Sequence, residues 1–194
     1  MTQTPDFARV VSLATHDLRT PLATVSGFAK TLLRSDELEE PATRYLGMIE
    51  AASAQMVELL DELGLAARIE DGRYEPVLRK QDTRELADAA AEELGADRVH
   101  VSGTGATVNV DPAATRRAVT ALAQCALRHG GLEAVALVVV GPALELTPIT
   151  PASAPVVLGR DIRDLGAAVA GRLIAALGGT VELEGETLHI RLPG

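Results

Sequence analysis

The chain has 194 residues, a hydrophobic share of 47% and a formal net charge of -9 at pH 7. That length fits one or two domains with a real core, and with two Phe, two Tyr and no Trp the core must be built from Ala, Leu and Val. The acidic balance argues against nucleic acid as a partner, because a binder needs a basic footprint to release counterions from phosphates. It also disfavours an anionic membrane surface.

Cellular location is indicated by three further features of the sequence. A single Cys rules out an internal disulfide framework and suits a reducing cytoplasm. The first residues lack the charged-then-apolar organisation of a signal peptide. The most apolar run, residues 134–146, is interrupted by Gly141-Pro142 and is too short to span a bilayer. We therefore expect a cytoplasmic protein with no membrane partner.

The first predicted helix runs from about Pro5 to Arg34. Its apolar residues alternate at three- and four-residue spacing, which is typical of the seam of a packed helical bundle. The seam residues are Phe7, Val11, Ala14, Leu18, Pro21, Val25, Phe28 and Leu32. His16 lies opposite this seam and is expected to face solvent. Pro21 removes one backbone hydrogen bond, so the helix should bend beside His16.

A second helix is predicted to open at Pro41 and to end at the Gly72 stop signal. Its seam consists of Tyr45, Ile49, Ala52, Met56, Leu59, Leu63 and Ala66, and the apolar stripe is widened by Met48, Leu60 and Ala67. Two stripes this wide cannot cover each other completely. We expect two such hairpins to form a four-helix bundle, which makes the protein a homodimer. The alternative is that the second domain covers the hairpin.

The domain boundary is predicted between residues 1–75 and residues 76–194. In the second part, helices are predicted at 83–94, 111–127 and 161–177, a loop at 147–160, short strands around a Gly turn at 99–103 and 106–110, and strands at 133–140, 143–146, 180–184 and 187–192. Helices that alternate with a mixed sheet give an α+β sandwich. The expected fold class is α+β, a helical hairpin followed by this sandwich.

One string in the first helix has a specific pattern. It reads His16-Asp17-Leu-Arg19-Thr20-Pro-Leu22, in which Arg19 and Thr20 follow His16 at i+3 and i+4 and share its face. The string resembles the phosphoacceptor box of bacterial histidine kinases, whose usual pattern is His-Glu/Asp-x-Arg-Thr/Asn-Pro-Leu. The match covers every position of the box. The alternative is an ordinary surface histidine on an amphipathic helix.

Residues 77–194 look, in order and spacing, like the ATP-binding domain of histidine kinases, the Bergerat-type fold. The clearest remnants are Asp111-Pro112 and the final Leu-Gly-Gly-Thr-Val-Glu-Leu at residues 177–183. The family pattern Asn-Leu-x-x-Asn-Ala-x-Lys aligns with residues 121–128. This alignment puts Cys125 at the magnesium position, where a neutral buried thiol is a poor ligand for a hard cation.

Two further nucleotide ligands of the resembled family are missing. Its Asp-x-Gly-x-Gly element falls on residues 144–150, which contain neither Asp nor Gly. Its later glycine pair is reduced to Asp164-Leu165-Gly166, where a carboxylate would repel phosphate. We expect a degenerate ATPase-like domain that holds no ATP and no metal. Cys125 is interpreted as a small core residue, and no metal-like or catalytic spacing is assigned to His100, His129 and His189.

A phosphoacceptor helix without a working nucleotide site resembles the dimeric histidine phosphotransferases of bacterial phosphorelays. The resemblance implies that His16 takes a phosphoryl group from a receiver Asp and passes it to a second receiver. Asp17 would orient His16 and accept its proton, and Arg19 would neutralise charge in the transition state. Thr20 corresponds to the position that places water for receiver dephosphorylation.

No cofactor is expected on this chain, because the receiver domain would supply the magnesium. The implied partners are a second copy of the chain, response-regulator receiver domains, and an upstream hybrid or sensor kinase. Two alternatives stay open. One is a divergent cytoplasmic sensor histidine kinase that phosphorylates itself from ATP, and the other is a non-catalytic module that binds receivers.

Overall fold

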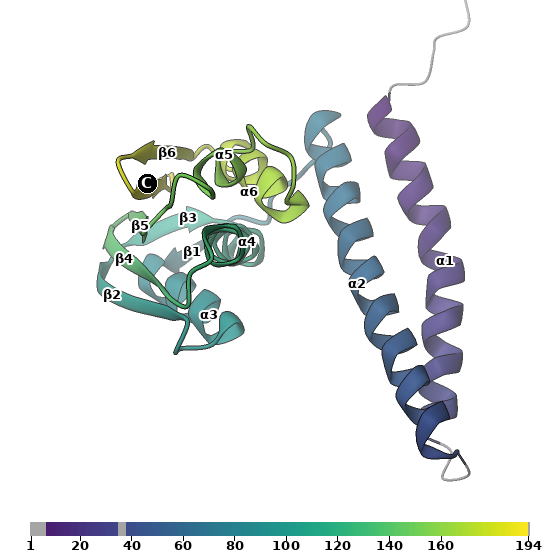
Figure 1. Ribbon diagram of the computed structural model, residues 1–194. Helices are drawn as coiled ribbons and strands as arrows, with labels where there is room; N and C mark the ends of the chain where they lie inside the picture. Colours follow the sequence, from purple (N-terminus) through teal and green to yellow (C-terminus); the bar gives the residue numbers. More distant parts are fainter. Residues whose placement is uncertain (1–6, 35–37, 194) are drawn as a thin grey trace, which may run out of the picture. The chain divides into compact units, whose positions relative to one another are not determined.

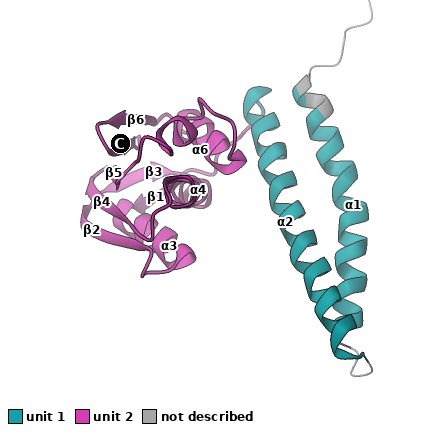
Figure 2. Ribbon diagram, viewed as in Figure 1, with its two compact units in different colours: residues 1–73 teal, residues 74–194 magenta. Residues whose placement is uncertain are grey.

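The structure is a computed structural model that describes residues 7–34 and 38–193 (Figure 1). The predicted helix start at Pro5 lies outside these residues. The chain forms two compact units, Met1–Arg73 and Tyr74–Gly194 (Figure 2), and each is described by itself. Within the described ranges, no helix is both long and apolar enough to cross a bilayer.

The first unit is a pair of helices that lie side by side, α1 (Phe7–Leu33) and α2 (Glu40–Glu70) (Figure 1). Helix α1 continues through Pro21 as one helix. Helix α2 carries proline in its first turn, where the missing N–H is tolerated. It ends just before Gly72, whose φ of +65° suits glycine.

The buried seam of this helical pair lies one residue after the predicted seam. On α1 the covered positions include Ser12, Thr15, Leu22, Ser26, Ala29 and Leu33, and on α2 they include Leu46, Ser53, Val57, Leu60, Gly64 and Ala67. Of the predicted seam residues whose burial is described, only Val11 and Ala66 are half-buried, and the rest are exposed. The predicted placement is therefore wrong for the contact within one chain. The reason is side-chain size, because small residues let two helix backbones approach closely although they contribute little to an apolar pattern.

The predicted seam forms a second, exposed stripe. Its large exposed members are Leu18, Val25, Phe28 and Leu32 on α1 and Tyr45, Ile49, Met56, Leu59 and Leu63 on α2. Met48 is exposed beside them. We call these ten residues the outer stripe. Soluble proteins rarely expose a continuous apolar surface of this kind unless another chain covers it.

The second unit is built on a five-stranded mixed sheet with the order β2-β4-β5-β7-β6. Its strands are β2 (Val99–Gly105), β4 (Val135–Gly141), β5 (Ala143–Thr147), β6 (Thr180–Glu184) and β7 (Thr187–Arg191). Strands β2 and β4 are parallel, and the other pairs are antiparallel. Two connections agree with the sequence analysis. They are the two-residue turn between β6 and β7 and the hairpin of β4 and β5.

Two strands depart from the expectation. The strands predicted around a glycine turn do not pair with each other, because β2 joins the main sheet whereas β3 (Thr107–Val110) pairs with β1 (Arg79–Asp82) in a separate two-stranded sheet. Strand β1 was not predicted. Gly103 in β2 has φ +90°, and a β-carbon there would lie 2.1 Å from the carbonyl oxygen of Val139, so only glycine fits.

Helices α3 (Thr83–Leu94), α4 (Pro112–Gly130) and α6 (Leu165–Ala176) pack against this sheet (Figure 1). Buried leucine and isoleucine side chains fill the space between the layers, among them Leu122, Leu137, Leu144, Leu173, Ile174 and Ile190. Helix α6 begins four residues later than predicted, because Asp164 is its N-cap. A short helix, α5 (Ala154–Val157), interrupts the predicted loop. The α+β fold class is confirmed.

Candidate functional site

His16 lies on α1 with 77% of its side chain exposed, so it faces solvent as predicted. Its Nδ1 is 3.2 Å from Oδ1 of Asp17, whose side chain is 66% exposed. Because a carboxylate accepts hydrogen bonds, we assign the ring proton to Nδ1 in this contact. That tautomer leaves the lone pair on Nε2, which is free to act as a nucleophile.

The backbone under His16 is held by a close approach of the two helices. The neighbouring Thr15 is 5% exposed, and its hydroxyl donates a hydrogen bond of 2.8 Å to the carbonyl of Ser12. Gly64 of α2 faces it, and a β-carbon added there would lie 3.4 Å from Thr15 Oγ1. This contact fixes one side of α1 while the opposite side presents His16 to solvent.

The other two predicted site residues lie one turn further along α1. Arg19 donates a hydrogen bond from Nη2 to Oδ1 of Asp61 on α2, and both side chains are nearly half exposed. Thr20 is exposed, and its carbonyl accepts a hydrogen bond from the Thr24 hydroxyl at 3.2 Å. The structure thus brings His16 and Asp17 into direct contact, whereas Arg19 is paired with α2.

A shallow hollow of about 530 Å³ lies beside His16 and is lined also by Ser12, Leu13 and Arg73. Arg73 is half exposed, and its Nε donates a hydrogen bond to the Asp71 carboxylate. Sequence reasoning missed this arginine, since nothing in the turn after α2 places it near the first helix. A guanidinium at this position adds positive charge next to the imidazole, which favours an incoming anion.

In the second unit, Cys125 occupies a fully buried position on α4. The pKa of its thiol is raised to about 12, mainly by burial and also by the negative charge of Asp164, while the Arg128 guanidinium acts in the opposite direction. The thiol is therefore neutral at physiological pH, as expected for a core cysteine.

Asp164 closes the N-terminal end of α6. Its Oδ1 accepts a hydrogen bond from the Ala167 amide at 3.1 Å, and its Oδ2 lies 3.2 Å from His129 Nε2 and 3.5 Å from Arg128 Nη1. The N-terminus of a helix attracts anions. Here the chain's own carboxylate, with 10% of its side chain exposed, takes that place.

No metal-like spacing is assigned to His129 from the sequence, and the structure places this histidine beside Cys125 and Asp164. Cys125 and His129 stand at i and i+4 on α4, so they share a face, and Asp164 meets them from the start of α6. Potential ligand atoms of the three residues all lie within 4.8 Å of one another. The i, i+4 spacing of a cysteine and a histidine was the available signal.

The region aligned with the adenine-reading element turns its apolar side chains into the core. Leu144 and Leu146 point inward from β5, and Ile149 is also buried. None of these three side chains can accept a hydrogen bond from a base. Glu145 is the one carboxylate of this segment, and its Oε1 lies 3.4 Å from Nδ1 of His189 on β7.

Comparisons with known proteins agree with this geometry. Residues 8–72 match the His Kinase A (phospho-acceptor) domain, which accounts for the helical unit and its exposed histidine. ShkA, in the crystal structure of its full-length form in complex with AMPPNP, shares the fold with a TM-score of 0.70 and 20% identity. The similarity covers 94% of this chain and 44% of ShkA. The chain is thus similar to the phosphoacceptor domain of histidine kinases in its helical unit and to ShkA in its fold.

Two curated proteins match this chain over shorter segments. Sensor protein DivL of Caulobacter vibrioides is 31% identical over 93 residues, or 43% of this chain. Sensor histidine kinase TrcS of Mycobacterium tuberculosis is 44% identical over 61 residues, or 30% of this chain. In each case the match spans 12% of the relative's length.

Proposed function

We propose that this protein is a histidine phosphotransferase of a phosphorelay. It takes a phosphoryl group from the aspartate of one receiver domain onto His16 and hands it to the aspartate of another. The observation that carries the proposal is a contrast between the two units. The acceptor histidine is exposed and paired with a carboxylate, whereas the aligned nucleotide site has a buried neutral Cys125 and the carboxylate of Asp164 in place of ligands.

The transfer step follows from the tautomer of His16. The Nε2 lone pair attacks phosphorus, a P–N bond forms, and the P–O bond to the receiver aspartate breaks with its electrons returning to that carboxylate. As the imidazole becomes positive, the Nδ1 proton is stabilised by, or passes to, Asp17 at 3.2 Å. Reversal of the step on a second receiver restores the neutral ring. We expect the receiver to bring any magnesium that the step requires.

Cations near His16 support the same reaction. The phosphoryl group spreads negative charge over three oxygens in a loose transition state, which a positioned guanidinium stabilises. Arg73 lines the hollow beside His16, and Arg19 lies on the adjacent turn of α1. We assign the charge-neutralising role to Arg19, with Arg73 as a second contributor, and we assign the positioning of water for receiver dephosphorylation to Thr20.

The proposed active form is a homodimer. The outer stripe leaves large apolar side chains such as Phe28, Met48 and Leu59 exposed on both helices of the first unit. A second copy that places its own outer stripe against them would complete a four-helix bundle. The exposed side of α1 that carries His16 would remain available to receiver domains.

A second candidate function is ATP-dependent autophosphorylation by a divergent sensor kinase. It is favoured by the likeness to ShkA in complex with AMPPNP, which extends over 94% of this chain, and by the sensor kinase relative TrcS. In that reading the phosphoryl donor is ATP rather than a receiver. The acceptor would still be His16.

The deciding experiment compares two phosphoryl donors. Receiver domains from the same genome, labelled by acetyl phosphate and freed of excess donor, are mixed with the unmodified protein and with His16→Gln. We expect acid-labile, base-stable label on the unmodified protein alone, and no label from MgATP. Label from ATP would establish the kinase reading. Equal uptake by His16→Gln, or receiver binding without any label, would refute the phosphotransferase assignment.

A further inference from the structure

Cys125, His129 and Asp164 form a cluster of three potential metal ligands inside the second unit. Their sulfur, nitrogen and oxygen atoms lie within 4.8 Å of one another. Cys125 is fully buried, the Asp164 side chain is 10% exposed and that of His129 is 19% exposed. A cysteine, a histidine and an aspartate that converge at one shielded point call for a chemical explanation beyond packing.

The backbone holds the three ligands from two directions. Cys125 and His129 are one turn apart on α4, so their side chains extend from the same face. Asp164 comes from the N-cap of α6, where Oδ1 is engaged by the Ala167 amide and Oδ2 is left to face His129. A metal bound to Oδ2 would therefore leave the helix cap intact.

The distances suit a tetrahedral ion. Two ligands that each lie about 2.0 Å from zinc at a tetrahedral angle are about 3.3 Å apart. His129 Nε2 and Asp164 Oδ2 are 3.2 Å apart. A potential ligand atom of each residue, the sulfur included, lies within 4.8 Å of those of the other two, so side-chain rotations would bring the sulfur to bonding distance.

The donor set selects the kind of metal. Thiolate, imidazole and carboxylate are the three side-chain ligands of zinc in proteins, whereas magnesium and calcium take oxygen ligands almost alone. We propose that Cys125, His129 and Asp164 bind one Zn²⁺ ion per chain, with a water molecule as fourth ligand. This site is independent of the proposed phosphotransfer, because it uses neither His16 nor a receiver.

Charge balance supports the same ion. Binding would displace the thiol proton of Cys125 to the solvent, and the resulting thiolate together with the Asp164 carboxylate neutralises the two positive charges of the metal. No hydrogen bond to the thiol is found among the described residues, so deprotonation breaks none there. The Arg128 guanidinium, 3.5 Å from Oδ2, must move away, and its side chain is 61% exposed and free to turn into solvent.

Cobalt(II) is the probe for this site, because it follows zinc in geometry and a thiolate ligand gives it a near-ultraviolet charge-transfer band. The full chain is freed of metal with a chelator, kept reduced and titrated with Co²⁺. We expect one equivalent per chain, growth of the charge-transfer band, loss of the band on addition of Zn²⁺ and a higher melting temperature with Zn²⁺. A titration without the band, or one in which Zn²⁺ leaves the melting temperature unchanged, overturns the proposal.

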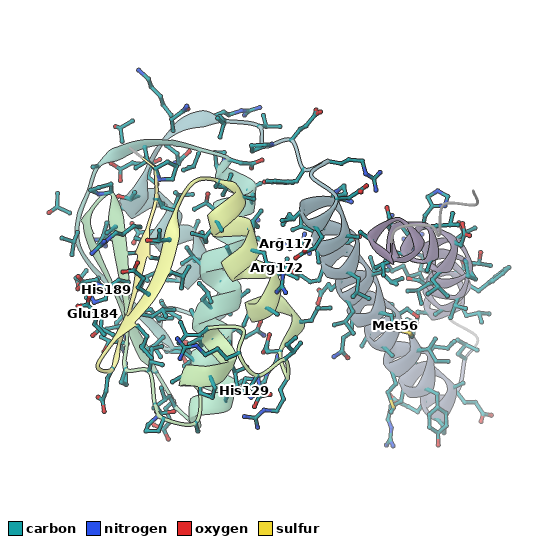
Figure 3. The ribbon with its side chains drawn as sticks, turned by 90° about the horizontal axis from the view of Figure 1, so that it is seen from above. Met56, Arg117, His129, Arg172, Glu184 and His189 are labelled. Atoms are coloured by element: carbon teal, nitrogen blue, oxygen red, sulfur yellow. The ribbon has the colours of Figure 1, made fainter. Side chains whose placement is uncertain are left out.

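The variants separate the three ligands from fortuitous histidine binding. Cys125→Ala should abolish the charge-transfer band, and Asp164→Asn, which keeps the N-cap, should weaken binding by at least about tenfold, as should His129→Gln. His189→Gln is the matched control, since His189 is 22% exposed, contacts Glu145, and lies beside Glu184 away from His129 (Figure 3). Unchanged binding in Cys125→Ala or Asp164→Asn, or loss of binding in His189→Gln or His16→Gln, overturns the assignment.

Discussion

Arg19 of α1 forms an ion pair with Asp61 of α2, one helical turn from the proposed acceptor His16. The pair joins the two helices of the first unit at an exposed position. An exposed ion pair contributes at most about 1 kcal/mol to stability. Arg19 can therefore have one of two roles: it stabilises the contact between α1 and α2, or it stabilises the negative charge of the incoming phosphoryl group.

Two substitutions that both break this ion pair answer the question. Asp61→Asn keeps the Arg19 cation, whereas Arg19→Ala removes it. If Arg19 stabilises the phosphoryl group, Arg19→Ala should slow transfer to His16 by at least about tenfold, and Asp61→Asn should not. Single-turnover labelling by a phosphorylated receiver measures both rates. Equal slowing in the two variants would give Arg19 a purely structural role.

The neighbours of His16 should separate transfer from dephosphorylation. Asp17→Asn retains the nucleophile but removes the proton acceptor 3.2 Å from Nδ1, so transfer should fall about a hundredfold. Thr20→Ala should leave transfer near normal and slow the loss of phosphate from the receiver. Both rates come from the same time course of labelled receiver and free phosphate. A Thr20→Ala variant that transfers slowly but dephosphorylates normally would contradict the assignment.

Assembly depends on the outer stripe. Leu59→Glu places a charge in the proposed dimer interface, where an unpaired buried charge is strongly destabilising, so the variant should be monomeric or unfolded. Gln55→Glu, which introduces the same charge at an exposed polar position of α2, should remain dimeric. Light scattering and circular dichroism report mass and helix content. A folded, monomeric unmodified protein at micromolar concentration would disprove the dimer.

Nucleotide should leave the protein unaffected. With Cys125 buried and Asp164 at the start of α6, MgATP should not change the melting temperature. A ligand present at a hundred times its dissociation constant adds about 2.7 kcal/mol, which a thermal scan detects easily. A magnesium-dependent rise would favour the sensor kinase over the phosphotransferase.

The buried thiol makes stability depend on pH in the alkaline range. The pKa of Cys125 is raised from 9.0 to about 12 in the folded chain, so above about pH 9 the unfolded state loses a proton that the folded state keeps. Stability should therefore fall as pH rises, by up to about 1.4 kcal/mol per pH unit relative to Cys125→Ala. Urea unfolding of metal-free protein from pH 8 to pH 10.5 measures it. Parallel curves for the two proteins would show that the thiol pKa is not raised.

Much of the fold follows from local signals in the sequence. The cap at Asp111, the glycine stops and the two tight hairpins are chemical requirements of single turns, so they can be recognised without the structure. Pairing between distant strands is different. Strands β2 and β3 adjoin in sequence but enter separate sheets, because β2 pairs with β4 and β3 pairs with β1.

The residues of the candidate site can also be separated into those that the sequence predicts and those that it does not. The exposure of His16 and its contact with Asp17 could be predicted, because they depend on neighbouring residues of one helix. Arg73 and the Cys125–His129–Asp164 cluster could not be, since each depends on segments brought together by folding. The buried seam between α1 and α2 was misplaced in the sequence analysis, because Thr15 and Gly64 let the two helices approach closely although neither residue adds to an apolar pattern.

The two stripes on each helix couple folding of the first unit to protein concentration. The buried seam between α1 and α2 combines small residues such as Thr15, Ser53 and Gly64 with a few leucines, while the large residues of the outer stripe would be buried only when two copies meet. Dilution should therefore lower the unfolding midpoint of α1 and α2, as mass action requires for a folded state that depends on association. The sheet-based unit carries its own buried core, and its midpoint should stay constant across the same dilution series.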